Sequence, residues 1–165
     1  MLSTTQKVHT SNPTHENFSI YLVSPHAEDL SALRHILHHS DWKIARMSDC
    51  REATKHLTEN ASSIVICERD LPDGTWKDIL QHISHLQNPP LELVMCRHAD
   101  DSLWAEVLSM GGYDVLLKPF DNREVTRIVG MAWRQWSDSL TGRKANAATA
   151  SHSSHRHYPV AASAS

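Results

Sequence analysis

Short apolar runs that alternate with amphipathic stretches are the feature that most constrains how this chain folds. Five apolar runs of strand length lie at residues 18–23, 42–47, 63–68, 91–96 and 113–117. Each is followed by a stretch with apolar residues at helical spacing, at residues 26–39, 49–60, 74–86, 100–112 and 121–136. Strands that alternate with helices in this way predict a parallel sheet with helices on both faces, joined by right-handed crossovers.

The individual segments support this interpretation. The run SIVICE at 63–68 is continuously apolar, which is typical of a strand buried on both faces. The first helical stretch carries one apolar stripe, and so does the last: Leu30, Leu33 and Leu37, then Val125, Val129, Ala132 and Trp136. The expected fold class is a doubly wound α/β fold with five parallel strands in the order 2-1-3-4-5, whose functional crevice lies at the carboxyl ends of the strands.

The length of 165 residues favours one domain at 18–136 between two tails. The polar segment 1–17 is expected to be a flexible arm. The Ala/Ser/His-rich segment 137–165 has no apolar period, so we expect a disordered tail that is too polar and short to form an output domain. Its histidines suggest a weak metal-binding tract, and a solvated tail is the simpler interpretation: His152, His155 and His157.

Charge and cysteine content exclude several classes of protein. The net charge of −3 gives no reason to expect nucleic acid as a partner. Three cysteines are too few and too scattered for a disulfide framework or a zinc site: Cys50, Cys67 and Cys96. The N-terminus lacks the apolar core of a signal peptide, and no apolar run is long enough to span a bilayer. We therefore expect a soluble cytoplasmic protein with no membrane partner.

Three segments resemble the receiver domains of response regulators. SIVICERDLPDG at 63–74 resembles their third strand and the loop that follows, and GGYDVLLKPF at 111–120 resembles their fifth strand and its Lys-Pro pair. YLVSPHAEDLSALRHIL at 21–37 resembles their first strand and helix. The resemblance covers residues 18 to about 136, and it implies a flavodoxin-like receiver fold, a place in a two-component phosphorelay and a Lys118-Pro119 bond that is often cis in this family.

The resemblance also implies five features that phosphoryl transfer requires. Two acidic residues after the first strand and an aspartate ending the third hold Mg²⁺, which prefers carboxylate oxygens. That aspartate is also the nucleophile. A lysine after the fifth strand pairs with the phosphoryl oxygens, and a hydroxyl ending the fourth strand donates to them. An aromatic residue on the fifth strand moves in response.

This sequence keeps only the lysine, Lys118. The other positions are occupied by Ser24 and Pro25 (acidic pair), Glu68 (phosphoacceptor), Cys96 (hydroxyl) and Val115 (aromatic). Glutamate has one more methylene than aspartate, which moves its carboxylate by about one C–C bond, and such a displacement matters for in-line transfer. We therefore expect a degenerate receiver that is not an enzyme and has lost its Mg²⁺ cofactor.

Several residues near this site have more than one interpretation. Glu68 is expected to pair with Lys118, and its fixed negative charge would mimic the phosphorylated state. Asp70 is an alternative phosphoacceptor, although the following Leu71-Pro72 indicates that the strand has ended. Cys96 is interpreted as an inert buried thiol rather than a redox sensor. Three further aspartates are interpreted as solvated residues at helix ends: Asp29, Asp100 and Asp101.

Partner binding is predicted at the face that receivers commonly use for dimerisation and output, made of the fourth helix, the fifth strand and the fifth helix. Trp104, Val115 and Trp133 lie on these elements, and aromatic residues are enriched in interfaces. Packing against the core is the alternative role for the tryptophans. The partner is expected to be a protein: a signalling kinase, an output protein or a second copy of the chain.

The leading hypothesis is a stand-alone degenerate receiver that acts through protein contacts, independently of phosphorylation. One competitor is a functional receiver that uses Glu68 or Asp70 with atypical metal binding. A second is a flavodoxin-like binder of small ligands, which the absence of glycine from VSPHAED disfavours. A third is a metal site on helical histidines, for which the sequence offers no completing ligand: His35, His38 and His39, or His82 and His85.

Overall fold

The computed structural model describes residues 19–153, with side chains described as far as residue 147. Five parallel strands form the central sheet in the order β2-β1-β3-β6-β7. Their bounds are Ser19–Val23 (β1), Lys43–Met47 (β2), Ile64–Glu68 (β3), Leu91–Cys96 (β6) and Asp114–Leu117 (β7). Counted along the sheet strands alone, this order is the predicted 2-1-3-4-5. The arm at 1–17 and the end of the tail, with His155 and His157, lie outside the described residues.

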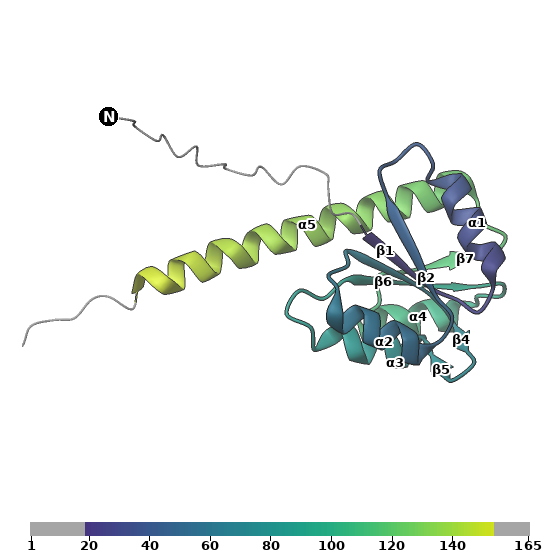
Figure 1. Ribbon diagram of the computed structural model, residues 1–165, viewed down its shortest axis with the longest axis horizontal. Coiled ribbons are helices and arrows are strands. Elements are labelled where there is room, and N and C mark those ends of the chain that lie inside the picture. The colour runs from purple at the N-terminus through teal and green to yellow at the C-terminus, as the bar shows by residue number, and fades with distance from the viewer. Residues whose placement is uncertain (1–18, 154–165) are drawn as a thin grey trace, which may run out of the picture.

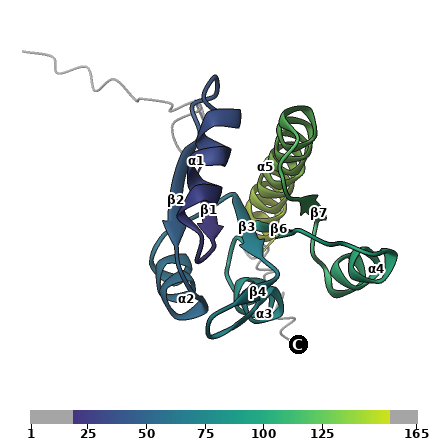
Figure 2. The same ribbon diagram turned by 90° about the vertical axis from the view of Figure 1, so that its right-hand side faces the viewer.

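Helices cover both faces of the sheet, as Figures 1 and 2 show. Their bounds are Ala27–Ile36 (α1), Cys50–Glu59 (α2), Trp76–Ser84 (α3), Asp101–Met110 (α4) and Asn122–Ser153 (α5). Helices α1 and α5 pack on one face, and α2, α3 and α4 pack on the other. The predicted doubly wound fold is therefore confirmed.

Strand β3 explains why its sequence is continuously apolar. Ile64 and Ile66 belong to the core layer under α1 and α5. Val65 and Cys67 belong to the core layer under α2, α3 and α4. Because the side chains of a strand alternate between its two faces, a central strand needs apolar residues at every position. The strand ends at Glu68, where the core gives way to the crevice.

The helix ends follow signals that the sequence carries. Asp49 caps α2 by accepting a hydrogen bond from the backbone nitrogen of Glu52 at 2.8 Å, which confirms the predicted cap. Asp100 caps α4 in the same way, with the backbone nitrogen of Leu103 at 2.8 Å. Gly111 ends α4 with a φ of 101°, a conformation that glycine adopts without steric penalty. The two capping aspartates fix where the loops at the carboxyl edge end, and Gly111 begins the turn into β7 at the opposite edge.

Two short strands in the loop after β3 were not predicted. β4 (Asp70–Leu71) and β5 (Gly74–Thr75) form an antiparallel hairpin around Pro72 and Asp73. The carboxylate of Asp73 accepts hydrogen bonds from the backbone nitrogens of Cys50 and Arg51 at 2.7 and 3.0 Å, and so anchors the hairpin to α2. A strand of two residues is too short to show alternation, so the sequence pattern does not predict this hairpin.

The structure differs from the expectation of disorder after residue 136. Helix α5 continues to Ser153 and extends away from the sheet, as Figure 1 shows. The segment lacks an apolar period, but it contains Ala145, Ala147 and Ala148, and alanine has the highest helix propensity. Among the described residues, no helix is both long and apolar enough to cross a membrane.

Candidate functional site

Lys118 lies at the carboxyl edge of the sheet, directly after β7. The residue is 8% exposed, and its ammonium group forms an ion pair with the carboxylate of Glu68 at the end of β3. The predicted Glu68–Lys118 pair is thereby confirmed. The backbone nitrogen of Lys118 also donates to the carbonyl of Cys96 at 2.8 Å, and the Lys118-Pro119 bond is cis, as the resemblance implied. The ends of three strands thus fix the lysine.

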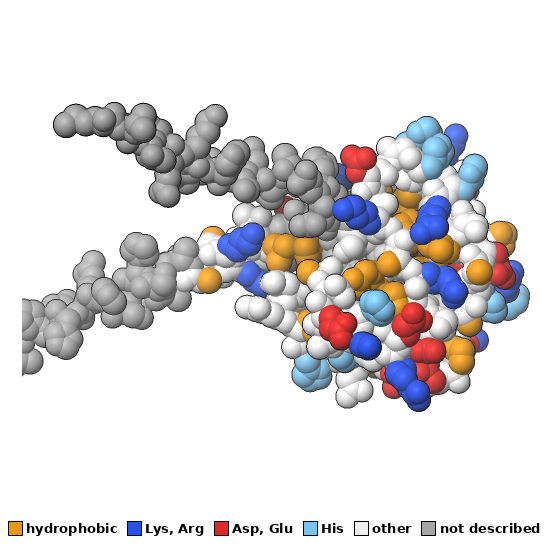
Figure 3. Space-filling model, in the orientation of Figure 1, with side chains coloured by type: hydrophobic (Ala, Val, Ile, Leu, Met, Phe, Trp, Pro, Cys, Tyr) orange, Lys and Arg blue, Asp and Glu red, His pale blue; other side chains and the backbone are white. Residues whose placement is uncertain are grey.

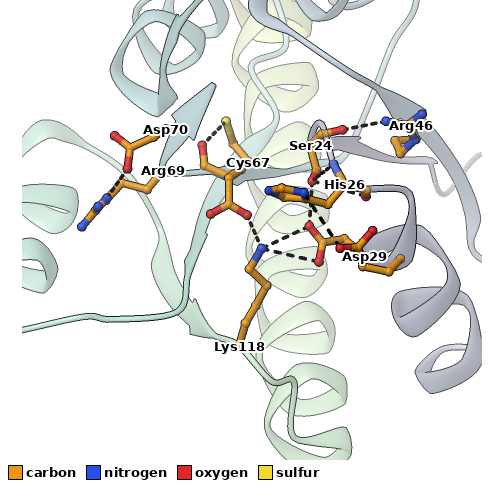
Figure 4. Close-up of polar contacts among 10 residues, drawn as sticks. Ser24, His26, Asp29, Arg46, Cys67, Arg69, Asp70 and Lys118 are labelled. Carbon is orange, nitrogen blue, oxygen red and sulfur yellow. Dashed lines mark hydrogen bonds and ion pairs between the residues drawn. The ribbon is translucent and has the colours of Figure 1, made fainter. Parts of the chain in front are cut away.

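Asp29 supplies a second carboxylate to the same ammonium group. It is only 4% exposed, and its Oδ2 lies 3.2 Å from Nζ of Lys118. Figure 4 shows the two side chains pointing toward each other. The interpretation of Asp29 as a solvated helix-end residue was therefore wrong. Its partner lies 89 residues away in the sequence, so local spacing gave no signal for the contact.

Ser24 fixes the position of the Asp29 carboxylate. Ser24 is fully buried, and its hydroxyl donates to Oδ2 of Asp29 at 2.7 Å. The backbone nitrogen of His26 donates to that hydroxyl at 3.0 Å, and Nη1 of Arg46 donates to the Ser24 carbonyl at 2.7 Å. Pro25 is exposed and adds no polar side-chain atom. We refer to Ser24, Asp29, Glu68 and Lys118 as the lysine cluster.

Both carboxylates of the lysine cluster are engaged by its ammonium group. Mg²⁺ is bound through carboxylates in near-octahedral geometry, and here both carboxylates are bonded to an ammonium group. Within residues 19–147, no three His, Cys, Asp or Glu side chains are grouped to hold a metal ion. The helical histidines are included in that search. One ring nitrogen of His38 is also already engaged, because its Nδ1 lies 2.5 Å from the carbonyl oxygen of His35.

Cys96 ends β6 at the position that holds a hydroxyl in the family. The residue is buried, and burial raises the pKa of its thiol. Burial also raises the pKa of Cys50, to about 12. A thiol with a raised pKa is protonated at neutral pH and is a poor nucleophile. These properties agree with an inert thiol at position 96.

Asp70 is not part of the lysine cluster. It lies in β4, is exposed, and accepts a hydrogen bond from Nε of Arg69 at 2.7 Å. Figure 4 shows Asp70 and Arg69 pointing away from Lys118. Of the two candidate acceptors, only Glu68 therefore lies beside the lysine.

The three candidate interface residues have different environments. Val115 is fully buried, so its side chain is not available to a partner. Trp104 is half-buried, and its Nε1 donates to Oδ1 of Asp114 at 2.9 Å. Trp133 is half-buried and packs against the core layer under α1 and α5. Core packing, the alternative considered for the tryptophans, accounts for much of their surface.

Sequence reasoning missed the hydrophobic side chains that are exposed beside these elements. Leu108 and Met110 on α4 are 55% and 47% exposed, and Met131 on α5 is 46% exposed. Tyr113 and Arg134 line a shallow pocket next to Met131. The predicted tryptophans are partly covered by the core. The signal for the methionines is their place in the helix pattern, because they lie outside the buried apolar stripes of α4 and α5.

Comparison with known proteins gives a consistent result. The sequence pattern of the response regulator receiver domain matches residues 20–130. The transcriptional regulatory protein ZraR of Escherichia coli (strain K12) is 27% identical over 131 residues, which cover 78% of this chain and 30% of that protein. FixJ of Bradyrhizobium diazoefficiens, also a transcriptional regulatory protein, is 24% identical over 116 residues, 70% of this chain and 57% of that protein. The chain thus spans about a third to just over half of these relatives.

Solved structures agree on the fold. The signal receiver domain of an HD domain-containing protein from Pseudomonas fluorescens Pf-5 superimposes with a TM-score of 0.71 at 20% identity, over 81% of this chain and 98% of that one. The observed strand order and the lysine after β7 place the lysine cluster at the same edge where the resemblance located the receiver site. The chain therefore belongs to the response regulator receiver domain family of two-component systems.

Proposed function

We propose that this receiver acts without phosphoryl transfer, as a protein-interaction module in two-component signalling. The observation that supports the proposal is the state of Lys118, whose ammonium group is bonded to both Glu68 and Asp29. In the family this lysine pairs with phosphoryl oxygens. Here it is already paired with two anions, in a setting where all three side chains are largely buried.

Electrostatics at the lysine cluster oppose the approach of a phosphoryl donor. One ammonium group and two carboxylates leave the cluster with a net charge of −1. Phosphoryl transfer depends on metal ions that neutralise developing negative charge, and the positions for the metal-binding acidic pair hold Ser24 and Pro25. A dianionic donor would meet net repulsion without a metal to offset it. We therefore propose that Mg²⁺ is not a cofactor of this domain and that the domain is not an enzyme.

The same contacts suggest what the cluster does instead. Carboxylate oxygens of Glu68 and Asp29 occupy the coordination of the ammonium group that phosphoryl oxygens would take. They tie the ends of β3 and β7 to the first turn of α1 through one side chain. A fixed internal anion of this kind holds the carboxyl edge of the sheet in one arrangement, independent of a kinase.

A protein partner fits the surface at α4, β7 and α5. Leu108, Met110 and Met131 expose large apolar side chains there, and residues of this type mark contact surfaces when they gather. On the opposite side of the domain, which Figure 3 draws, acidic and basic side chains are interspersed without a field of one sign. With a net charge of −3 and no such field on that side, a protein partner is favoured over nucleic acid or a membrane: a signalling kinase, an output protein or a second copy.

Intact-protein mass spectrometry tests the loss of phosphoryl transfer. The full chain is incubated with acetyl phosphate and Mg²⁺ at neutral pH, and we expect no added phosphoryl mass. Glu68→Gln and Asp70→Asn are matched variants that each remove one candidate carboxylate without changing its size. An added mass in the wild-type protein that disappears in either variant would establish a functional phosphoacceptor and refute the proposal.

The interaction surface is tested by sedimentation and by partner capture. Met131→Glu places a negative charge in the exposed apolar surface of α5, and Lys55→Glu introduces a carboxylate at an exposed, already charged position of α2 outside that surface. We expect Met131→Glu alone to weaken self-association or binding of an identified kinase or output protein. Equal effects of the two variants would mean that the surface at α4, β7 and α5 has no special role.

A further inference from the structure

Glu92 is a buried acid that the lysine cluster does not use. It is the second residue of β6, at the opposite end of that strand from Cys96, and it is 1% exposed. Neither oxygen of its carboxyl group has a hydrogen-bond partner among the described residues. Leu93 and Met95 face α1 and α5, so strand alternation places Glu92 on the other face, under α2, α3 and α4.

The surroundings of Glu92 favour its protonated form. Burial raises the pKa of Glu92 well above its ordinary value of 4.5. Removal of an ionised carboxylate from water without a compensating partner is strongly unfavourable. Burial without a partner therefore favours the neutral carboxyl group over the carboxylate in the folded domain. Loss of that proton would leave a bare charge inside the sheet–helix layer.

A groove of about 510 Å³ lies beside this position, between α3 and the end of α4. Leu91, the residue before Glu92, lines it together with Leu80 and Ile83 of α3 and Met110 of α4. We call this hollow the α3/α4 groove. It brings solvent close to the strand position that carries the buried acid.

Of the two helices that give the α3/α4 groove its name, α4 buries fewer side chains. It buries two of its side chains, those of Leu103 and Val107. Helix α3 buries four, those of Trp76, Ile79, Leu80 and Ile83. Figure 2 shows α4 at the periphery of the domain, beside the edge strand β7. Displacement of α4 therefore removes less apolar surface from the core than displacement of α3.

Titratable groups around the groove differ in how they are engaged. Those on the surrounding elements include Cys67 (β3), Lys77 and Asp78 (α3), Glu106 (α4), Asp114 (β7) and Arg143 (α5). Lys77 is paired with Glu106, and Asp78 accepts a hydrogen bond from the backbone nitrogen of Thr75 at 2.8 Å. Arg143 donates to the carbonyl of Gln87 at 3.4 Å, so its cation is bonded to a neutral group.

We infer that Glu92 is a proton-dependent switch for the α3/α4 groove. While the carboxyl group is protonated, α4 packs over it and the groove is shallow. When the proton leaves for solvent, α4 moves outward and the carboxylate reaches water and the guanidinium of Arg143. This function lies beyond the one proposed above, because no residue of the lysine cluster takes part.

Hydrogen exchange on the full chain tests the inference between pH 5.5 and 8.5. In the wild-type protein we expect the opening equilibrium constant of amides in α4 and at the start of β6 to rise by up to about tenfold per pH unit, the limit for release of one proton. In Glu92→Gln we expect no such rise. Glu59→Gln, at an exposed acid at the end of α2, is the matched control and should behave as wild type.

Three results would overturn the inference. The first is an equal pH dependence in the wild-type protein and in Glu92→Gln. The second is an equal rise in β1 and α1, which would indicate global unfolding rather than opening of one groove. The third is a titration of the Glu92 carboxyl carbon, followed by NMR, at its ordinary pKa of 4.5. If Glu92→Gln fails to fold, Glu92→Met provides the same comparison.

Discussion

Acidic side chains are buried at both ends of the central sheet, and the two ends treat them differently. At the carboxyl end, Asp29 and Glu68 share the ammonium group of Lys118, and Ser24 donates a further hydrogen bond. At the opposite end of β6, the carboxyl group of Glu92 has no hydrogen-bond partner among the described residues. The first arrangement sets an opposite charge beside each carboxylate, whereas the second leaves the carboxyl group without any compensating partner.

The difference teaches how burial acts on an acid with and without a partner. A buried ion pair is strongly destabilised when one partner is removed, because the remaining charge is left without compensation. Replacing a buried acid that has no partner by an apolar residue stabilises the folded state, because the desolvation of that acid is unfavourable. Substitutions at the two ends should therefore change stability with opposite signs.

Removal of the ammonium group should have the largest effect. Lys118→Met keeps most of the side-chain volume but leaves two carboxylates facing each other inside the protein. We expect the free energy of unfolding at neutral pH to fall by about 3–5 kcal/mol, the range for breaking a buried ion pair from one side. Urea denaturation followed by circular dichroism measures the change. Lys55→Met, at an exposed position on α2, is the control and should stay within about 0.5 kcal/mol of wild type.

A loss no greater than that of Lys55→Met would break the comparison at this end. It would mean that water reaches the two carboxylates as soon as the lysine is gone, so that their burial depends on Lys118 itself. Lys118→Met combined with Glu68→Met separates these cases. If burial of bare charge is the cause, removing one carboxylate restores part of the lost stability.

Substitution of the unpaired acid should have the next largest effect, with the opposite sign. Glu92→Met replaces a buried carboxyl group without partners by an apolar side chain of similar size, and we expect stabilisation by about 1–3 kcal/mol at pH 8. The pKa of Glu92 is raised in the folded state, so the unfolded chain releases this proton at lower pH. The contribution of protonated Glu92 to the free energy of unfolding is complete below pH 4.5, and it is lost as the pH rises through the folded pKa. The gain should therefore be larger at pH 8 than at pH 5.

Denaturation at both pH values, with Glu59→Gln as an exposed control, measures this dependence. A destabilised Glu92→Met at pH 8 would contradict the comparison at the amino end of the sheet. It would show that the carboxyl group makes a favourable contact that outweighs its desolvation.

The same contrast separates what the sequence could predict from what it could not. The five strands were predictable because periodicity is a local signal. The Glu68–Lys118 pair, whose residues are 50 positions apart, was predictable only because both strand ends resemble those of receiver domains. Asp29 was assigned wrongly because no motif linked it to a partner 89 residues away. Glu92 passed unnoticed inside the apolar run LELVMC, since an acid near a strand end is commonly solvated. Burial of both acids depends on how the helices pack over the sheet, which the sequence of a single strand or turn does not specify.

Loss of the hydroxyl that orients Asp29 should be milder than either change above. In Ser24→Ala the carboxylate loses a buried hydrogen bond of 2.7 Å but keeps Lys118. We expect a loss of about 1.5–2 kcal/mol, the lower part of the range of about 1.5–3 kcal/mol for a hydrogen bond to a charged group, because Lys118 still compensates the carboxylate. Thermal denaturation measures it, and Ser109→Ala, which removes a hydroxyl from the exposed surface of α4, is the control.

The smallest effect is expected at an ion pair outside both buried sites. Lys77 and Glu106 join α3 to α4, and both side chains are 43% exposed. Exposed pairs contribute about 0–1 kcal/mol and are screened by salt, so Lys77→Met should lower stability by less than 1 kcal/mol and by less still in 1 M NaCl. A large, salt-insensitive loss would show that this pair, rather than the burial of Leu103 and Val107, holds α4 in place. The Lys77–Glu106 pair would then determine the position of α4, and this pair would have to break before the groove beside Glu92 could open.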